Sequence, residues 1–164
     1  MLATVLLAFY QQNYEKDIES YYLSEDQLQY TAIPKDALKS CEQGKEVYPI
    51  VIIYQQQVAG FFTLERDSEA AYSTNQNAFA LRAFSIHYSL QGKGIAQQAL
   101  KILDAFIRQN FLGIDEIVLG VNHKNTAAQY VYKCAGFKDN RKRVFGRKGE
   151  QYVFEKKIKR AIQR

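Results

Sequence analysis

The stretch that most constrains the fold of this chain is a glycine-rich turn between a strand-like run and a long helix-like run. Residues 79–87 before the turn are apolar and aromatic, whereas residues 95–110 after it repeat their apolar side chains with helical periodicity. The turn contains Gly92, Lys93 and Gly94 and no acidic residue. Such a turn points the unpaired N–H groups of a helix N-terminus at one place, and glycines leave room there for a phosphate. We therefore expect an anion-binding turn.

The spacing of the two glycines excludes two common phosphate-binding patterns. A mononucleotide P-loop needs glycines five residues apart followed by Lys and Ser or Thr, and the dinucleotide turn needs three spaced glycines. The residues read Gln91-x-x-Gly94-x-Ala96 instead. This pattern resembles the pyrophosphate-binding turn of the GNAT family, the Gcn5-related N-acetyltransferases, although an ordinary strand–helix turn can also contain two glycines.

A second stretch, residues 119–137, strengthens the resemblance. It consists of an apolar run, an asparagine, a predicted helix and a Gly-Phe pair. Five of its positions match the second signature of the GNAT family: Asn125, Ala128, Tyr132, Gly136 and Phe137. The two motifs stand in the family's order, with a predicted helix and strand between them. The resemblance extends over about residues 48–158, and the N-terminal third matches only loosely.

The resemblance implies a cleft for acetyl-CoA between the fourth and fifth strands, which part in this family. Its pyrophosphate would lie on the turn, and Asn125 would hydrogen-bond its pantetheine arm. The backbone N–H of Ile86 would polarise the acetyl carbonyl. Tyr132 would protonate the departing sulfur, because a tyrosine with a pKa of ~10 is protonated at neutral pH. A buried structural role for Tyr132 is the alternative. The expected cofactor-binding residues are Phe84, Ile86, Gln91, Gly92, Lys93, Gly94, Ile95, Ala96, Asn125, Ala128 and Tyr132.

Two residues are candidates for the general base that removes a proton from the acceptor amine. Glu65 stands at the end of the predicted third strand, and His87 stands at the end of the fourth. The ordinary pKa of histidine, ~6.5, suits a base at neutral pH. A structural His87 and a simply solvated Glu65 are the alternatives. Arg82 is unusual inside a strand, and we expect it to pair with a carboxylate or to face the cleft.

The periodicity along the chain predicts an α/β fold. The expected strands are residues 2–9, 48–54, 58–64, 78–87, 117–121, 137–145 and 151–158. The expected helices are residues 14–23, a short one from Ser24, one from Pro34 to Gly44, 95–110 and 125–134. Together with the family resemblance, this order predicts a GNAT-like mixed, mostly antiparallel sheet of about seven strands. We expect it to be splayed at strands 4 and 5 and flanked by about four helices.

Length and composition indicate one globular domain over residues 1–164, with 47% hydrophobic and 24% charged residues. The apolar opening, residues 1–10, lacks a basic leader and is too short to span a bilayer, so we expect a buried strand and no membrane contact. Cys41 and Cys134 have no metal-ligand spacing. We therefore expect no metal site and a reducing, cytoplasmic location.

Charge is distributed unevenly along the chain. Residues 133–164 carry a net charge of +9, and residues 1–132 carry −4. Such asymmetry can mark a nucleic-acid-binding face, but the aromatic residues of the basic segment alternate as in strands. We therefore expect solvated strands and no nucleic-acid partner. Acidic residues in the N-terminal helices and at 65–69 would attract a cationic amine such as a polyamine, or are ordinary surface charge.

These features together predict an acetyl-CoA-dependent N-acetyltransferase. The acetyl group would pass directly to a primary amine of a polyamine, amino acid, antibiotic-like amine or peptide. The alternative is a non-catalytic acyl-CoA-binding or sensing domain of the same fold. Tyr132 with Asn125 favours the enzyme, because a sensor needs no proton donor at the sulfur. The family resemblance also allows a homodimer.

Overall fold

The computed structural model describes residues 4–41, 46–66 and 72–159. These residues form seven strands, five α-helices and two short 3-10 turns. In chain order they are β1 (Val5–Phe9), η1 (Gln12–Tyr14), α1 (Glu15–Glu19), α2 (Glu25–Leu28), α3 (Pro34–Ser40), β2 (Val47–Tyr54), β3 (Gln57–Arg66), β4 (Ala78–Ile86), η2 (Tyr88–Leu90), α4 (Ile95–Asn110), β5 (Glu116–Asn122), α5 (Thr126–Cys134), β6 (Lys138–Gly146) and β7 (Gly149–Lys157). Each helix of the described residues is too short or too polar to cross a membrane.

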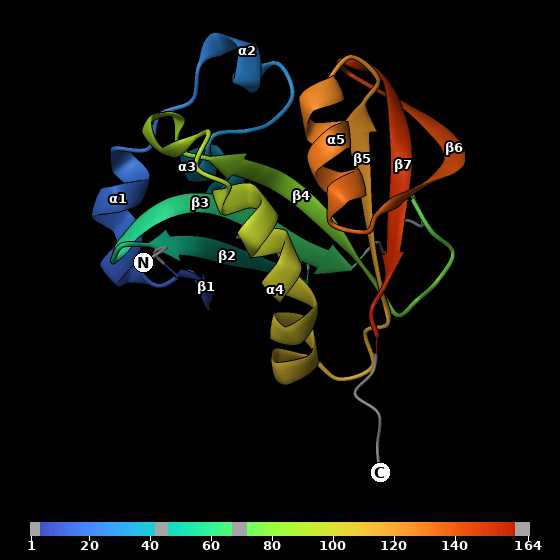
Figure 1. The fold of residues 1–164 in the computed structure, drawn as a ribbon, viewed down its shortest axis with the longest axis horizontal. Coiled ribbons are helices and arrows are strands. Elements are labelled where there is room, and N and C mark those ends of the chain that lie inside the picture. Colours follow the sequence, from blue (N-terminus) through green and yellow to red (C-terminus); the bar gives the residue numbers. More distant parts are fainter. Residues whose placement is uncertain (1–3, 42–45, 67–71, 160–164) are drawn as a thin grey trace.

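The strands form one mixed sheet in the order β1-β2-β3-β4-β5-β7-β6 (Figure 1). Neighbouring strands are antiparallel except for β4 and β5, which are parallel. This parallel pair is joined only from Ala78 opposite Glu116 to Ala80 opposite Val118. Further along, β4 keeps its partner β3 and β5 keeps its partner β7, so the two strands part. The predicted fold, including the opening between strands 4 and 5, is confirmed.

Helices pack against both faces of the sheet. On one face, here called the α4 face, Ile95 and Leu103 of α4 join residues of the strands in the main hydrophobic core, and α5 packs beside them. Figure 1 shows α4 and α5 in front of the sheet. On the other face, here called the α1 face, Ile18 of α1 and Ala37 of α3 form a second core with Phe61 of β3. An opening in the sheet can therefore be lined from two sides.

A β-bulge in β4 determines which of its side chains lie on which face. Thr63 of β3 lies opposite Arg82, but two residues earlier on β3 the partner is Ser85, so β4 has one extra residue here. Within the bulge, Ala83 has a φ of +54°, in the left-handed region that few non-glycine residues adopt. Arg82 and Ala83 both lie on the α1 face, whereas Phe84 packs into the core of the α4 face. The alternation of side chains is thus shifted by one residue at the opening.

The N-terminal helices differ most from their prediction. The helix expected over residues 14–23 ends at Glu19, and Tyr22 is exposed although its neighbours Tyr21 and Leu23 are buried. The short helix after Ser24 begins with the predicted capping box. The described residues contain five α-helices, whereas about four were predicted.

Most other boundaries agree with the sequence to within two residues. The first strand begins at Val5 instead of Leu2, and residues 1–3 lie outside the described residues. Gly44, the predicted end of the third helix, also lies outside them, and so do residues 67–71, which include part of the acidic stretch at 65–69. The long helix has the predicted bounds, Ile95–Asn110.

Candidate active site

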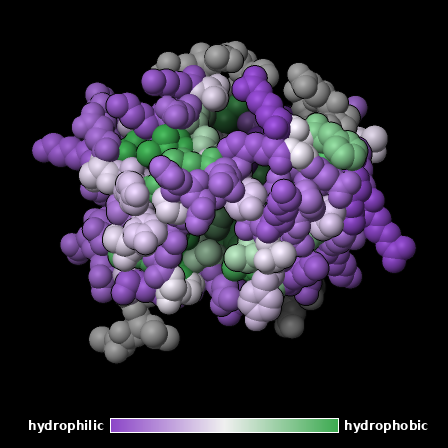
Figure 2. Space-filling view, turned by 90° about the horizontal axis from the view of Figure 1, so that it is seen from above, coloured by the Kyte–Doolittle hydropathy of each residue, from purple (hydrophilic) through white to green (hydrophobic). Residues whose placement is uncertain are grey.

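A cavity of about 1000 Å³ occupies the opening between β4 and β5. From the α4 face it is lined by the end of β4, the turn before α4, and α5. From the α1 face it is lined by residues of α2, α3, β3 and the bulge of β4. Seen from above, the rim is mostly hydrophilic and hydrophobic residues are visible in the recesses between hydrophilic side chains (Figure 2). The cavity therefore occupies the opening in the sheet and is lined from both faces.

The glycine-rich turn lies at the α4-face end of this cavity. Gly92 and Gly94 have φ values of +79° and +77°, which favour glycine, and Gly94 is the N-cap of α4. A Cβ added to either residue would meet no protein atom within 4 Å. The space in front of the backbone is therefore open, and the N–H groups of the first turn of α4 lack helical acceptors. This arrangement suits a phosphate group.

The expected residues of this turn do not all line the cavity. Gln91, Gly92 and Ala96 do, whereas the exposed Lys93 and the buried Ile95 are not among its lining residues. Gly94 is likewise outside the lining and acts through its backbone as the helix cap.

Among the described residues, no strand pairs with the edge of β4 beyond Ala80 on its β5 side. Phe84 and Ile86 line the cavity there, and their edge can pair with an extended ligand as an added strand would. One of the carbonyls is already used, because the side chain Nε2 of Gln91 donates to the oxygen of Ile86 at 2.9 Å. This bond ties the turn to the end of the strand.

Helix α5 begins at the opposite wall of the opening. Asn125 is its N-cap, and its Oδ1 accepts a hydrogen bond from the N–H of Ala128 at 3.2 Å. The amide nitrogen Nδ2 of Asn125 has no hydrogen bond with a described residue, so it can donate to a ligand. Asn125, Ala128 and Val131 all line the cavity, so the predicted second motif forms one continuous wall.

Tyr132 lies on the same wall, two helical turns from Asn125. Its ring is 6.0 Å from the ring of Phe84 across the opening and 5.6 Å from that of Phe137. Desolvation raises the pKa of Tyr132 above its usual value. Its hydroxyl makes no hydrogen bond with any residue that the structure describes. A protonated, unpaired hydroxyl at the opening can donate to a group bound between the strands.

The α1-face end of the cavity contains an ion pair. The Nε of Arg82 lies 2.5 Å from Oε1 of Glu65, and the guanidinium stacks 4.8 Å above the ring of Tyr72. All three residues line the cavity, and so does Asp26 of α2. The expectation that Arg82 pairs with a carboxylate or faces the cleft is confirmed, because it does both.

His87 lies outside the lining of the cavity. Its Nδ1 accepts a hydrogen bond from the N–H of Ser89 at 3.2 Å, and its Nε2 lies 3.3 Å from the carbonyl oxygen of Ser20. The ring also packs against Tyr21, with the ring centres 5.2 Å apart. Both ring nitrogens are thus used in joining η2 to the end of α1. The structure does not bring His87 together with Tyr132 and Glu65.

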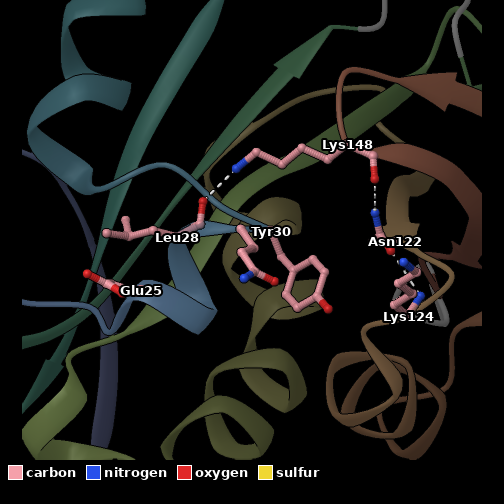
Figure 3. A pocket seen from close by; sticks show the side chains of 7 residues that line it. Glu25, Leu28, Tyr30, Asn122, Lys124 and Lys148 are labelled. Atoms are coloured by element: carbon pink, nitrogen blue, oxygen red, sulfur yellow. Dashed lines mark hydrogen bonds between the residues drawn. The ribbon is translucent and has the colours of Figure 1, made fainter.

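A smaller hollow of about 510 Å³ adjoins the cavity beyond α2 and shares Tyr30 and Asn122 with it (Figure 3). Lys148, in the turn between β6 and β7, reaches across and donates to the carbonyl oxygen of Leu28 at 2.5 Å. Asn122 holds that turn, since its Nδ2 donates to the carbonyl oxygen of Lys148 at 2.8 Å. These two hydrogen bonds therefore link α2 to β5, through the turn between β6 and β7, at the outer rim of the cavity.

Several lining residues have no signal in the sequence motifs. Tyr30 and Thr31 follow α2, Tyr72 precedes β4, and Gln151 belongs to β7. Their polar side chains surround the α1-face end of the cavity. They come from three segments distant in sequence, so no spacing rule could have grouped them.

The sequence is similar to those of known acetyltransferases. Residues 8–137 match the acetyltransferase (GNAT) family. A protein of Bacillus subtilis (strain 168), named "Uncharacterized N-acetyltransferase YbbJ", is 35% identical over 155 residues, which cover 93% of this chain and 97% of that protein.

Two solved structures share the fold at low identity. The aminoglycoside acetyltransferase AAC(6')-Ib with coenzyme A and kanamycin has a TM-score of 0.76 at 15% identity, covering 94% of this chain and 95% of that chain. The spermidine N-acetyltransferase of Vibrio cholerae with CoA and spermine has a TM-score of 0.63 at 17% identity, covering 94% and 96%.

Proposed function

This chain belongs to the acetyltransferase (GNAT) family, and we propose that it acetylates the primary amine of a small molecule or peptide by direct transfer. Family membership makes it an N-acetyltransferase with acetyl-CoA as its cosubstrate. The observation that carries the proposal is the cavity through the sheet, with the unpaired hydroxyl of Tyr132 at the opening. A mere binding domain has no need for access from both faces.

The residues of the α4-face end fit acetyl-CoA. The N–H groups at the start of α4 suit a pyrophosphate, and the open edge of β4 suits the amide groups of a pantetheine arm. Nδ2 of Asn125 would add a donor to that arm. The cavity is also large enough to hold the arm and an acceptor together.

The reaction joins the amine nitrogen to the acetyl carbon and breaks the bond from that carbon to sulfur. Bound acetyl-CoA supplies the thioester carbonyl. The hydroxyl Oη of Tyr132 donates its proton to the departing thiolate, and the backbone N–H of Ile86 donates to the carbonyl oxygen as it gains charge. The amine must be neutral to react, so a base on the α1 face must accept its proton.

We assign that base to Glu65, directly or through a water molecule. Glu65 is only 24% exposed and lines the end of the cavity that an acceptor would enter. Its Oε1 contacts Arg82, and its other carboxylate oxygen has no hydrogen bond with any residue that the structure describes. His87, the other candidate, uses both ring nitrogens in structural contacts, which supports Glu65 over His87.

The proposal is tested by calorimetry with acetyl-CoA, followed by thiol release against amino acids, polyamines, aminoglycosides and peptides. Tight binding with turnover on one class is the expected result. Tight binding without turnover on any amine would contradict the proposal and favour a non-catalytic acyl-CoA-binding domain.

A further inference from the structure

The ion pair of Glu65 and Arg82 places a cation where an amine acceptor must bind. Arg82 lines the α1-face end of the cavity, and its side chain is 40% exposed, so its outer atoms are accessible. A cation repels a protonated amine, and nothing in acetyl transfer itself requires one at this end. A function in acceptor recognition would explain why an arginine is present at this end.

The contacts of Arg82 fix its guanidinium but leave its terminal nitrogens unused. Register places Arg82 opposite Thr63, so Glu65 lies diagonally across from it on the same face. Oε1 of Glu65 is close to Nε, and the ring of Tyr72 supports the plane of the guanidinium from one side. Neither Nη1 nor Nη2 has a hydrogen-bond partner among the residues that the structure describes. These two nitrogens form the end of the guanidinium that matches a carboxylate in a two-bond arrangement.

The pair as a whole is complementary to a zwitterion. The terminal nitrogens of Arg82 would bind a carboxylate, while the free oxygen of Glu65 and the nearby Asp26 would attract an ammonium group. In an α-amino acid the carboxylate and the ammonium group are attached to the same carbon. Their closely spaced charges match the charges of Glu65 and Arg82, which are in contact. A polyamine or aminoglycoside offers no anionic group for Arg82.

The ion pair lies close to the reacting groups along β4. Arg82 is two residues before Phe84, and a strand rises about 3.3 Å per residue. The Cα atoms of Arg82 and Phe84 are thus at most about 7 Å apart, even without the shortening by the bulge. The ring of Phe84 faces Tyr132 across the opening. An amino acid held by Arg82 would place its α-amine within reach of that opening.

We propose that the acceptor is a small aminocarboxylate, such as an α-amino acid, whose carboxylate binds the terminal nitrogens of Arg82. This inference rests on the proposed N-acetyltransferase function and names the class of its acceptor. Glu65 has a second function here, as the residue that orients Arg82.

The experiment compares matched acceptors that differ only in the carboxylate. Phenylalanine is paired with phenethylamine, leucine with isopentylamine, and lysine with cadaverine, and each amino acid amide is included. We expect kcat/KM to be roughly 10- to 100-fold higher for the carboxylate than for its partner, as a charged hydrogen-bonded pair would produce. O-phosphoethanolamine tests whether a phosphate replaces the carboxylate.

The variant Arg82→Gln should abolish this preference by raising KM for the amino acids. The ratio of kcat/KM for an amino acid to kcat/KM for its decarboxylated partner should then fall towards one. Arg82→Lys keeps the charge but loses the two-bond geometry, and it should give an intermediate ratio. The matched control is Arg66→Gln. Arg66 also pairs with a glutamate, Glu46, at 2.7 Å and lies 5.9 Å from the ring centre of Phe79, but it does not line the cavity. The Arg66→Gln variant should leave the ratio unchanged.

Each outcome decides the inference. Equal or better turnover of the decarboxylated amines, better turnover of O-phosphoethanolamine, or an unchanged ratio in a folded Arg82→Gln protein would overturn it. Binding to the CoA-loaded protein is measured separately by calorimetry. If amino acids bind through Arg82 but no thiol is released, Arg82 is a carboxylate-binding residue, whereas the assignment of an acceptor and the proposed function both fail. If no amino acid binds, the inference fails whatever else is turned over.

Discussion

The two ends of the cavity are built in different ways. At the α4-face end, the groups that would hold a ligand are mainly backbone N–H and C=O groups of the turn before α4 and of the edge of β4. At the α1-face end they are side chains, among them Asp26, Glu65 and Arg82, contributed by separate elements. The first end presents the same chemistry whatever side chains surround it. The second depends on which side chains the tertiary fold brings together.

This difference explains why one end can be assigned from motifs and the other cannot. Backbone donors at a helix start bind phosphates in many proteins, so the cosubstrate follows from the local pattern. The proposed acceptor class follows from the ion pair of Glu65 and Arg82, which no motif contains. Variants at each end should therefore alter different kinetic constants.

The largest effect is expected at the junction of the two ends, from Tyr132→Phe. Loss of the proton donor should lower kcat by about 100-fold or more, with little change in the Kd for acetyl-CoA. Thiol-release assays measure kcat, and calorimetry measures the Kd for acetyl-CoA. Tyr130→Phe is the control, because Tyr130 is on the same helix but 66% exposed. Equal turnover in the Tyr132 variant would remove this residue from the mechanism.

The raised pKa of Tyr132 also makes a prediction about pH. Desolvation disfavours the phenolate, so the hydroxyl should stay protonated as the pH rises through the usual tyrosine value of ~10. The profile of kcat against pH should therefore show no loss from Tyr132 below about pH 10. A decline with an apparent pKa well below ~10 in the wild type that disappears in Tyr132→Phe would contradict this.

A smaller effect is expected from Glu65→Gln at the acceptor end. Removing the proposed base should lower kcat/KM roughly 10- to 100-fold while acetyl-CoA still binds normally. His87→Gln should instead lower the melting temperature through loss of its contacts to Ser89 and Ser20 and leave kcat/KM within about twofold. The reverse pattern would assign the base to His87.

At the cosubstrate end, Gly94→Ala should weaken acetyl-CoA binding by roughly tenfold, measured as Kd by calorimetry. The left-handed φ of +77° also costs an alanine about 1–2 kcal/mol of stability. Gly113→Ala is the matched control, because Gly113 has a φ of +78° and equally open space but lies after α4. It should lose similar stability and keep its affinity, so equal losses of affinity in both variants would refute a specific role for Gly94.

The smallest effect is expected from Lys148→Ala at the rim. Loss of the bond to Leu28 should cost about 1 kcal/mol or less, and it should appear as faster hydrogen exchange in α2. The exposed Lys142 of β6 provides a control substitution. Unchanged exchange in α2 would show that the bond does not hold the rim together.

The sequence by itself determined those parts that depend on near neighbours in the chain. The turn with Gly92 and Gly94, the bounds of α4, and the helix start at Ser24 were all predicted. A helix cap joins residues two or three positions apart, and a positive φ belongs to a single residue, so the physics of these features is local.

Only the tertiary structure decided how distant segments complete the site. The sheet register puts Arg82 on the same face as Glu65, and the bulge at Ala83 then shifts the alternation of side chains so that Phe84 lies on the other face. His87 bonds to the turn after α1, and Lys148 bonds to a residue 120 positions away. Sheet register and packing determine such contacts, and neither can be read from the identity of one residue. The cosubstrate could therefore be predicted from the sequence, whereas the proposed acceptor class depends on contacts that only the fold creates.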